Sequence, residues 1–336
     1  MTGTLRPSQA TAINVVLVFA IALGASALIG SSSFDRFLTE TFIYVLAVLG
    51  LQIFIGNSGI VSFGHAAFML VAAYVSAWQS CCFALKPVFM PELPAFLLGI
   101  DVDPALAGVV GAAVAAALWL GVGLLLLRLS PVGTSIGLFA MLAMVVSFYQ
   151  NWTGWTGGAT SIVGLPTYVT PLVAIAWSAL AAVVALLFRD SHWGLQLRAS
   201  QDDKTAAEAS GVRVLAVRLL ALAISAFFVG MAGVLFGHFV GTLSVQFFWL
   251  DMTFLTLAML IAGGRRSVTG AIVGVILVRS VTDVFRGMES GIAVGGTSLS
   301  IPSGTQEVIL AIAILLILIF RPGGLLGTRE LRWPFR

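Results

Sequence analysis

Long apolar stretches recur along the whole of this 336-residue chain, and they constrain its fold more than any other feature. A helix needs about 20 mostly apolar residues to cross the hydrocarbon core of a lipid bilayer. Hydrophobic residues make up 59% of the chain and charged residues only 9%, whereas soluble domains carry roughly 25% charged residues. The sequence therefore predicts an all-α, polytopic integral membrane protein with about ten spans. The approximate limits of these spans are 11–30, 40–56, 60–80, 104–127, 131–150, 168–188, 214–241, 247–263, 267–285 and 305–320.

The positions of lysine and arginine predict which way these spans run. Cytoplasmic loops of membrane proteins carry an excess of these two residues. With ten spans and the N-terminus inside, most of the 17 basic residues fall in the cytoplasm: Arg6, Arg128, Arg189, Arg198, Lys204, Arg213, Arg265, Arg266, Arg321, Arg329, Arg332 and Arg336. Both termini are therefore expected in the cytoplasm. The net charge of +3 reflects this topology rather than binding to nucleic acid.

No boundary divides the membrane region, so residues 1–336 are expected to form a single transmembrane domain, with a cytoplasmic loop at 189–213 and a short cytoplasmic tail at 321–336. No clear internal repeat is visible, although inverted repeats are common in transporters. The glycine-rich third and ninth stretches are candidates for broken or re-entrant helices. The first stretch imitates a secretory signal ending at Ala25-Ser26-Ala27. Its apolar run exceeds the length of about 7–15 residues that a signal core has, so we interpret it as a span.

Neither the cysteines nor the histidines form a pattern that binds a metal. Cys81 and Cys82 are adjacent, which matches neither a redox motif nor a metal-ligand spacing, so they are expected to be inert apolar filling. The histidines at 65, 192 and 238 fall at different predicted depths. Neither lysine of the chain stands in a phosphate-binding P-loop. The chain is therefore expected neither to hydrolyse ATP itself nor to hold a metal or cofactor.

One short motif raises the possibility of a membrane enzyme. Ser58 lies in the run Gly56-Asn57-Ser58-Gly59, which fits the G-x-S-G of rhomboid-like intramembrane serine proteases. His238 is the base that such a mechanism would use. The two side chains are predicted at opposite membrane surfaces, about 30 Å apart, whereas a nucleophile and its base must hydrogen-bond. The sequence therefore argues against catalysis.

Residues 189–213 form a charged island, RDSHWGLQLRASQDDKTAAEASGVR, in this apolar chain. Ser200 and Asp203 have the spacing of a capping box, which predicts the start of a short helix outside the membrane. Asp202 and Asp203 are then expected at the positive end of that helix, and Gly211 at its left-handed C-terminal cap. Small and charged residues of the island are expected to contact a partner protein: Arg198, Lys204, Ala206, Ala207, Ala209, Glu208 and Arg213. The alternative is a solvated connector.

Ionisable residues inside predicted spans are functional candidates, because burying a charge in lipid is costly. Arg279 and Asp283 are four residues apart on one helix face and are expected to neutralise each other. Arg218 is expected to reach the cytoplasmic surface. Four groups are predicted near the outer ends of their spans, where they either form a polar vestibule for a solute or brace neighbouring helices: Asp251, Asp283, Glu307 and His238.

Four segments share order and spacing with one known family. They are GNSGIVSFGHAAFMLVAAY (56–74), WTGWTGGATSIVGLP (152–166), the island, and IFRPGGLLG (319–327). The first resembles the G-x-x-G-x-x-S-x-G-H-A-A-F segment of permease subunits of branched-chain amino acid ABC importers, specifically the M-type permease of the pair. The others resemble that family's T-G-G loop, its cytoplasmic coupling segment and its R-P-x-G-L-x-G end. Ala73 and the run Ala159-Thr160-Ser161 depart from the family pattern, and the second departure bears on solute identity.

The resemblance implies a transporter subunit with several partners. Such permeases pair with a homologous permease, two cytoplasmic ATPase subunits and an external solute-binding protein, in a bacterial or archaeal inner membrane. The solute is expected to be a branched-chain amino acid or a similar small polar molecule, with urea and short amides as alternatives. The island would dock on an ATPase and move the spans, through Arg198, Asp202, Asp203, Lys204, Ala206, Ala207, Glu208 and Gly211. The other class of function is a standalone secondary transporter or channel, but no midplane carboxylate pair is evident.

The start of the third stretch is a candidate for lining the pathway or the seam between the two permeases. His65 there is expected to be a buried packing and hydrogen-bonding residue. Its small and polar neighbours permit close helix approach: Gly59, Ser62, Gly64, Ala66 and Ala67.

Overall fold

The computed structural model describes residues 7–82, 85–289, 292–294, 297–299, 302, 304–327 and 330. Ten helices of at least 14 residues account for most of these described residues. They are α1 (Pro7–Ile29), α2 (Ser32–Ser58), α3 (His65–Ser80), α6 (Pro104–Leu126), α7 (Pro131–Asn151), α9 (Pro171–Asp190), α12 (Val214–Val240), α13 (Leu250–Gly263), α14 (Val268–Glu289) and α15 (Thr305–Phe320).

Short elements connect the long helices. The helical ones are α4 (Lys86–Phe89), α5 (Ala95–Leu98), α8 (Thr153–Thr156), α10 (His192–Asp202), α11 (Lys204–Ala209) and the 3-10 turn η1 (Val245–Phe248). Two antiparallel strand pairs complete the list, β1 (Ile162–Val163) with β2 (Thr242–Leu243) and β3 (Ile292–Val294) with β4 (Thr297–Leu299). In the first pair Ile162 lies opposite Leu243. The predicted all-α class is confirmed.

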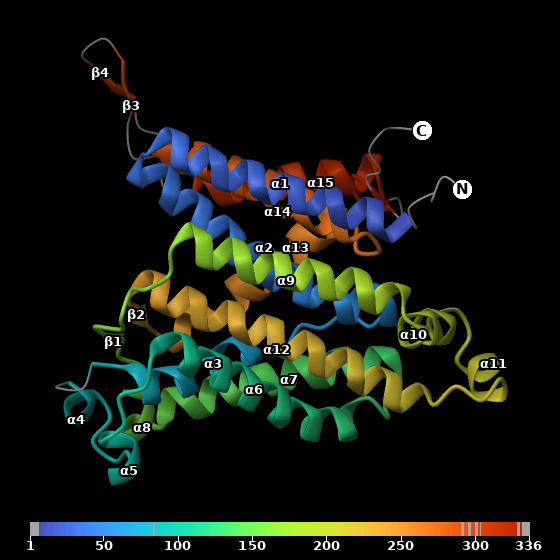
Figure 1. Ribbon diagram of the computed structural model, residues 1–336, viewed down its shortest axis with the longest axis horizontal. Coiled ribbons are helices and arrows are strands. Elements are labelled where there is room, and N and C mark those ends of the chain that lie inside the picture. The colour runs from blue at the N-terminus through green and yellow to red at the C-terminus, as the bar shows by residue number, and fades with distance from the viewer. Residues whose placement is uncertain are drawn as a thin grey trace, which may run out of the picture.

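The long helices lie side by side, and the chain passes back and forth between the two ends of the molecule (Figure 1). The start of α1, the end of α15, and both α10 and α11 lie at one end, on the right of the figure. The opposite end carries α4, α5, α8 and the pair of β1 and β2. The island therefore lies at the same end of the molecule as the start of α1 and the end of α15. The predicted orientation requires this, because it puts the island and both termini on one side of the membrane. Which end faces the cytoplasm stays a prediction.

Seven segments among the described residues are long and apolar enough to cross a membrane: Ser32–Ser58, Pro104–Leu126, Pro131–Asn151, Pro171–Asp190, Val214–Val240, Val245–Gly263 and Val268–Glu289. Shorter apolar helices cover Val15–Ile29 and Val308–Ile317, and α3 has only 16 residues. The polytopic class is confirmed, while the count of ten spans stays a prediction. The expectation of a broken ninth stretch is wrong, because α14 is continuous. The third stretch does begin with non-helical backbone, at residues 59–64.

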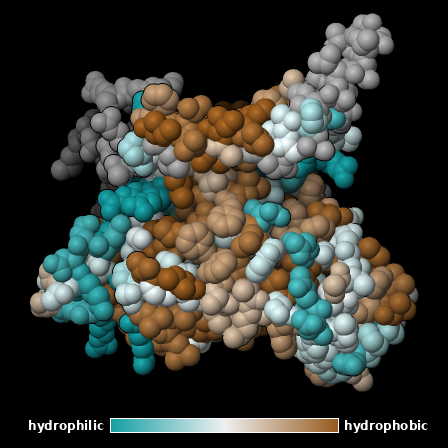
Figure 2. Space-filling model, turned by 180° about the vertical axis from the view of Figure 1, so that it is seen from behind, coloured by the Kyte–Doolittle hydropathy of each residue, from teal (hydrophilic) through white to brown (hydrophobic). Residues whose placement is uncertain are grey.

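Helix α2 is the centre of the packing. In its apolar window 94% of the residues are buried, against 28% in each of α6 and α7. Helix α3 packs closely on α12, because Gly233 brings the two backbones together: a Cβ at Gly233 would lie 2.4 Å from the carbonyl oxygen of Met69. Close approach through small residues is the usual way in which helices associate within lipid. On the face shown in Figure 2, hydrophobic residues cover the middle, and hydrophilic residues lie toward both ends.

Two long helices end in the same way at opposite ends of the molecule. Helices α2 and α12 each have 27 residues, and each is capped by a left-handed glycine, Gly59 and Gly241, with φ of 72° in both. After each cap the chain runs through a short segment that is not α-helical into a shorter helix, α3 or α13. Gly59 lies beside α10, whereas the carbonyl of Gly241 accepts from the backbone N–H of Gly164 next to β1. The matched breaks therefore have opposite orientation, the relation expected of an inverted repeat.

The connection after α3 is more ordered than a simple loop. The sulfur atoms of Cys81 and Cys82, expected to be inert apolar filling, are bonded to each other, a link that the sequence analysis did not anticipate. Lys86 is buried, and its ammonium group donates to the carbonyl oxygens of Ile100 at 2.6 Å and Leu97 at 3.3 Å. Burial lowers the pKa of Lys86. These bonds fix α4 against α5.

Candidate coupling site

The island folds as two helices rather than one. Ser191 caps α10, since its hydroxyl accepts from the N–H of Gly194 at 3.2 Å. Asp203 caps α11, since its carboxylate accepts from the N–H of Ala206 at 3.0 Å. Ser200 is therefore not a cap: it lies inside α10 and donates to the carbonyl of Leu197. The predicted capping box is wrong because a helix already occupies the residues before Asp203.

The end of the island follows the prediction more closely. Gly211 has a φ of 84°, in the left-handed region expected of it. Its N–H donates to the carbonyl of Glu208, and the N–H of Val212 donates to that of Ala207, the two bonds of a Schellman motif. Asp202 is the last residue of α10 instead of lying in a first helical turn. The expectation that Asp202 sits on a positive helix end is therefore wrong.

The inner face of α10 rests on the end of α2. The Nη1 atom of Arg198 donates to Oδ1 of Asn57 across 3.0 Å, and Asn57 is buried. Gly59 lies under Gln201, because a Cβ at Gly59 would come within 2.7 Å of the Gln201 side chain. Burial, reinforced by the positive charge of Arg189, lowers the pKa of Arg198. Gly59, a candidate for the pathway or for packing, thus packs under α10.

The outer face of α10 and α11 is open. Trp193 and Leu195 on α10 are exposed apolar side chains at an end where charged residues are common. On α11, Ala206 is exposed and Ala207 is the buried residue. Lys204 and Glu208 are half-exposed and pair with each other at 3.7 Å. The exposed aromatic residue Trp193 is of a type enriched at protein interfaces, and charged residues lie around it.

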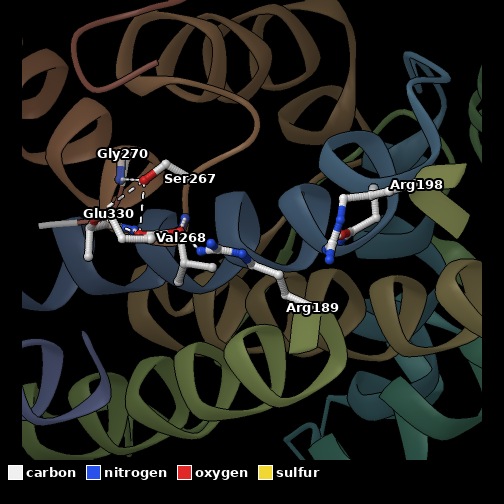
Figure 3. Close-up of polar contacts among 8 residues, drawn as sticks. Arg189, Arg198, Ser267, Val268, Gly270 and Glu330 are labelled. Carbon is white, nitrogen blue, oxygen red and sulfur yellow. Dashed lines mark hydrogen bonds and ion pairs between the residues drawn. The ribbon is translucent and has the colours of Figure 1, made fainter. Parts of the chain in front are cut away.

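Glu330, near the C-terminus, is bound beside the start of the island. Glu330 pairs with Arg189, at the end of α9, and only 5% of its side chain is exposed. Its carboxylate also accepts from the N–H groups of Val268 at 2.9 Å and Thr269 at 3.0 Å, and from the hydroxyls of Ser267 at 3.0 Å and Thr269 at 2.6 Å. Figure 3 shows this carboxylate between Arg189 and the first turn of α14, with Arg198 nearby. Glu330 thus joins α9, α14 and the tail, and a negative charge at a helix start is favourable.

The segment between α2 and α3 connects to α13. Nδ1 of His65 lies 2.9 Å from the carbonyl oxygen of Ser62, so this nitrogen carries the proton and donates. Nε2 lies 2.6 Å from the hydroxyl of Thr256, which itself donates to the carbonyl of Met252 at 2.7 Å. Both residues are buried, as expected for His65, and the hydroxyl of Ser62 is buried without a partner. Gly64 allows α7 to approach, because a Cβ there would lie 2.2 Å from the carbonyl oxygen of Leu138.

His238 belongs to the opposite end of the molecule. Its Nδ1 donates to the carbonyl of Pro166 at 2.9 Å, and its Nε2 lies 3.2 Å from the hydroxyl of Ser76. Ser58, in contrast, accepts from the backbone N–H of Ile60 at the end of α2. The serine and histidine of a protease are therefore not brought together. His238 braces α12 against α3 and the chain after β1.

Arg279 finds a partner that the sequence analysis missed. Its Nη2 atom lies 2.7 Å from Oε2 of Glu40, and its guanidinium carbon lies 5.2 Å from the centre of the Tyr44 ring. Arg279 is 2% exposed, whereas Asp283 on the next turn is exposed. The predicted Arg279–Asp283 pair is wrong: the guanidinium of Arg279 reaches Glu40 on α2, and Asp283, one turn later on α14, is exposed.

The predicted vestibule is not assembled by direct contacts. Among the described side chains, no hydrogen bond or ion pair joins Asp251, Asp283 and His238, and Asp251 is exposed. The side chain of Glu307 lies outside those described. Arg218 is buried rather than extended to the surface. Asp251, Asp283, His238 and Arg218 therefore do not form one polar cluster.

The residues missed by sequence reasoning share one property: their partners lie far away in the chain. Asn57 and Arg198 are 141 residues apart, as are Arg189 and Glu330. Asn57 stood within the GNSG run, and Glu40 at the start of a predicted span, so both were visible as polar residues. No local pattern indicated which basic residue each would meet.

The fold and these contacts define a polytopic helical membrane protein with a structured helical island at one end. A family model described as "Branched-chain amino acid transport system / permease component" matches residues 33–320. The chain therefore belongs to this family of branched-chain amino acid transport permeases.

Curated relatives of two kinds are similar to the chain. The high-affinity branched-chain amino acid transport system permease protein LivH of Escherichia coli (strain K12) is 27% identical over 311 residues, which cover 85% of this chain and 92% of the relative. LivH of Salmonella typhimurium is 26% identical over the same length. LivM of Salmonella typhimurium is 25% identical over 327 residues, covering 86% of this chain and 68% of the relative. No solved structure gives a significant match.

Proposed function

We propose that the chain is the membrane permease subunit of an ATP-driven importer, and that α10 and α11 couple it to a cytoplasmic ATPase. The subunit itself is non-catalytic and forms the translocation pathway with a second, homologous permease. An external solute-binding protein delivers the solute, and a second ATPase serves the partner permease. The chain takes one of the two permease positions, in the inner membrane of a bacterium or archaeon, and it is similar to both LivH and LivM proteins. Membership of the permease family supports the class, and the residues of the island support the coupling role.

The observation that carries the proposal is that α10 is anchored to α2 and still exposes large apolar side chains. Arg198 holds the helix to α2 through its bond to Asn57, while Trp193 and Leu195, which point in different directions because they are two residues apart, are both exposed. A solvated connector would not need the inner anchor or the outer apolar residues. A helix held between α2 and an ATPase, by contrast, would move α2 when the ATPase moves.

The contacts define a route by which such movement reaches the spans. A push on α10 acts on the end of α2, which is buried at the centre of the packing. Beyond Gly59 the chain continues to His65, which is bonded to Thr256 on α13. The Glu330 carboxylate connects the end of α9 to α14 in parallel. Coupling of this kind requires a contiguous set of packed groups that both sites bias.

The relatives support a proposal for the solute class. The LivH and LivM proteins that the chain resembles are permeases of high-affinity branched-chain amino acid transport systems. We propose leucine, isoleucine and valine, or a similar small polar solute, as the cargo. Urea and short amides are the alternatives that a solute screen would reveal.

The test is transport by purified components in proteoliposomes. The chain, its partner permease, the ATPase pair and the binding protein are reconstituted, and uptake of radiolabelled leucine is measured. Uptake should require ATP and each of the reconstituted components, including the binding protein. Collapsing the proton and sodium gradients should not affect it. Uptake by this chain alone, driven by an ion gradient, would show a secondary transporter and overturn the proposal.

A further inference from the structure

A pocket lies where the turn between α13 and α14 meets the segment after α15. Its volume is about 490 Å³, and it is lined by Ile261, Arg265, Arg266, Pro322, Gly323 and Gly327. Backbone hydrogen bonds hold its two walls together, from the N–H of Leu325 to the carbonyl of Ala262 at 2.9 Å and from that of Leu326 to Gly263 at 3.1 Å. The pocket is therefore part of the fold rather than a gap between loose segments.

The positive charge of this pocket is largely uncompensated. Arg265 takes part in none of the ion pairs found among the described residues. Arg266 has only a distant contact, 4.0 Å from Asp202, whose side chain is 81% exposed. The nearby buried carboxylate of Glu330 is already committed to Arg189 and to the start of α14. Two guanidinium groups in one pocket favour an anion with several oxygens, because each presents a planar fork of N–H donors.

The surroundings of the pocket are apolar on the side of the helices. Ile261, which lines the pocket, is 36% exposed, and Phe254 two turns earlier on α13 is 53% exposed. At the end of α15, Ile319 and Phe320 are 63% and 78% exposed. A charged pocket thus opens at the edge of an apolar surface. A small soluble anion would use only the arginines, whereas a phospholipid has both a charged head and apolar chains.

We propose that this pocket binds the phosphate headgroup of an anionic membrane phospholipid. Arg265 and Arg266 contact the phosphate, and the acyl chains lie along the exposed apolar residues of α13 and α15. Basic pockets at the cytoplasmic ends of membrane helices bind anionic headgroups in this manner. The site depends on membrane insertion and not on the identity of the transported solute, so its test is independent of the transport assay.

The experiment measures lipid binding to the purified full-length chain in a neutral detergent by native mass spectrometry. Dioleoyl phosphatidylglycerol and dioleoyl phosphatidylcholine are compared, because they share acyl chains and differ in headgroup charge. The wild-type chain should bind the first at least tenfold more tightly. The double variant Arg265→Gln/Arg266→Gln should lose this preference. The matched control Arg128→Gln/Arg213→Gln removes two exposed arginines outside the pocket and should keep it.

A second variant fills the pocket without changing its charge. Gly323 has room for a side chain, since the nearest atom to a Cβ there is 3.5 Å away. Gly323→Phe should therefore fold normally, as judged by size-exclusion chromatography, and should also lose the preference. Inorganic phosphate at millimolar concentration should compete poorly.

Four outcomes would overturn the proposal. Equal binding of the two lipids would show that the chain does not prefer the anionic headgroup. An unchanged preference in both pocket variants would show that the pocket is not where the lipid binds. Loss of the preference in the control as well would show an effect of net charge alone. Full displacement of the lipid by inorganic phosphate, with equally tight binding of phosphate by itself, would assign the pocket to a soluble anion.

Discussion

Arg198 donates a hydrogen bond from Nη1 to Oδ1 of Asn57 across 3.0 Å, joining a helix outside the predicted spans to the buried end of α2. The two residues are separated by 141 positions in the chain. Removing either partner should weaken the same connection, so the two changes should not be additive. We expect Arg198→Ala and Asn57→Ala each to reduce solute-stimulated ATP hydrolysis in the assembled transporter, and the double variant to be no worse than the more severe single one.

The free energy at stake is about 1.5–3 kcal/mol, the range for a hydrogen bond to a charged group. Asn57→Asp keeps an acceptor for Arg198 and serves as the control, because it should preserve most of the coupling. Strict additivity of the two alanine changes would contradict a direct role for this bond.

The outer face of the island should be sensitive to bulk and to charge reversal. Ala206→Trp places a large side chain on an exposed position of α11, and Glu208→Arg reverses a charge there. Each should weaken ATPase association by about 2 kcal/mol, as for disrupted interface anchors, without affecting membrane insertion or pairing with the second permease. Pull-down of the ATPase on the purified permease pair measures this loss. Ala95→Trp, an exposed change at the opposite end of the molecule, should leave association intact; wild-type behaviour of both island variants would identify the segment as a connector.

Glu330 and Arg189 should contribute unequally to thermal stability. Glu330→Ala removes the ion pair and leaves the first N–H groups of α14 without their acceptor, at a cost of about 2–3 kcal/mol. Arg189→Ala removes only the ion pair, and Arg189 is partly exposed, so its cost should be about 1 kcal/mol. Thermal unfolding in detergent compares the two. The idea fails if Arg189→Ala lowers the midpoint as much as Glu330→Ala does.

The buried pair of Arg279 and Glu40 should behave as a unit. Glu40→Leu leaves Arg279 buried without its carboxylate and should destabilise the protein by about 3 kcal/mol, whereas Glu40→Leu combined with Arg279→Met should recover much of that loss. Asp283→Asn, at the exposed position first expected to neutralise Arg279, should have little effect. Thermal unfolding midpoints are compared for the wild type, Glu40→Leu, the double variant and Asp283→Asn. A large effect of Asp283→Asn would favour Asp283 over Glu40 as the partner of Arg279.

Orientation can be read from labelling of introduced cysteines. In a Cys81→Ser/Cys82→Ser background, a cysteine at the exposed position Lys204 should react with a membrane-impermeant thiol reagent only from the cytoplasmic side. One at the exposed position Thr160 should react only from outside. The opposite pattern would invert the proposed topology.

The fold class was predictable because it depends on local composition. Apolar runs such as 214–241 reappear as α12 (Val214–Val240) with nearly the same limits. The left-handed cap at Gly211 was also predictable, because it depends on the preference of one residue for one conformation. Boundaries failed where several local patterns compete: Ser200 fits a cap in isolation, but the preceding residues form a helix that begins at His192.

The candidate site was predictable only in part, since its partners are distant in sequence. The charge of Arg279 indicated that a partner was needed, but Asp283 was the nearest carboxylate in the sequence while Glu40 was the nearest in space. Glu330 lies in a tail with no helical periodicity, and its role depends on α9 and α14 meeting there. Such contacts follow from how helices pack, which composition and spacing do not specify.

The glycine caps of α2 and α12 end these two helices at opposite ends of the molecule. Because Gly59 and Gly241 each already hold a left-handed conformation, the chain beyond either cap can reorient while the 27-residue helix before it keeps its backbone hydrogen bonds. A transporter that moves solute against a gradient must never be open to both sides of the membrane at once, so it needs two gates that open separately. Gly59 lies under Gln201 of α10, while Gly241 lies beside β1. If the chain couples to an ATPase as proposed, the break at Gly59 would serve an inner gate beside the coupling helices, and the break at Gly241 an outer gate at the opposite end.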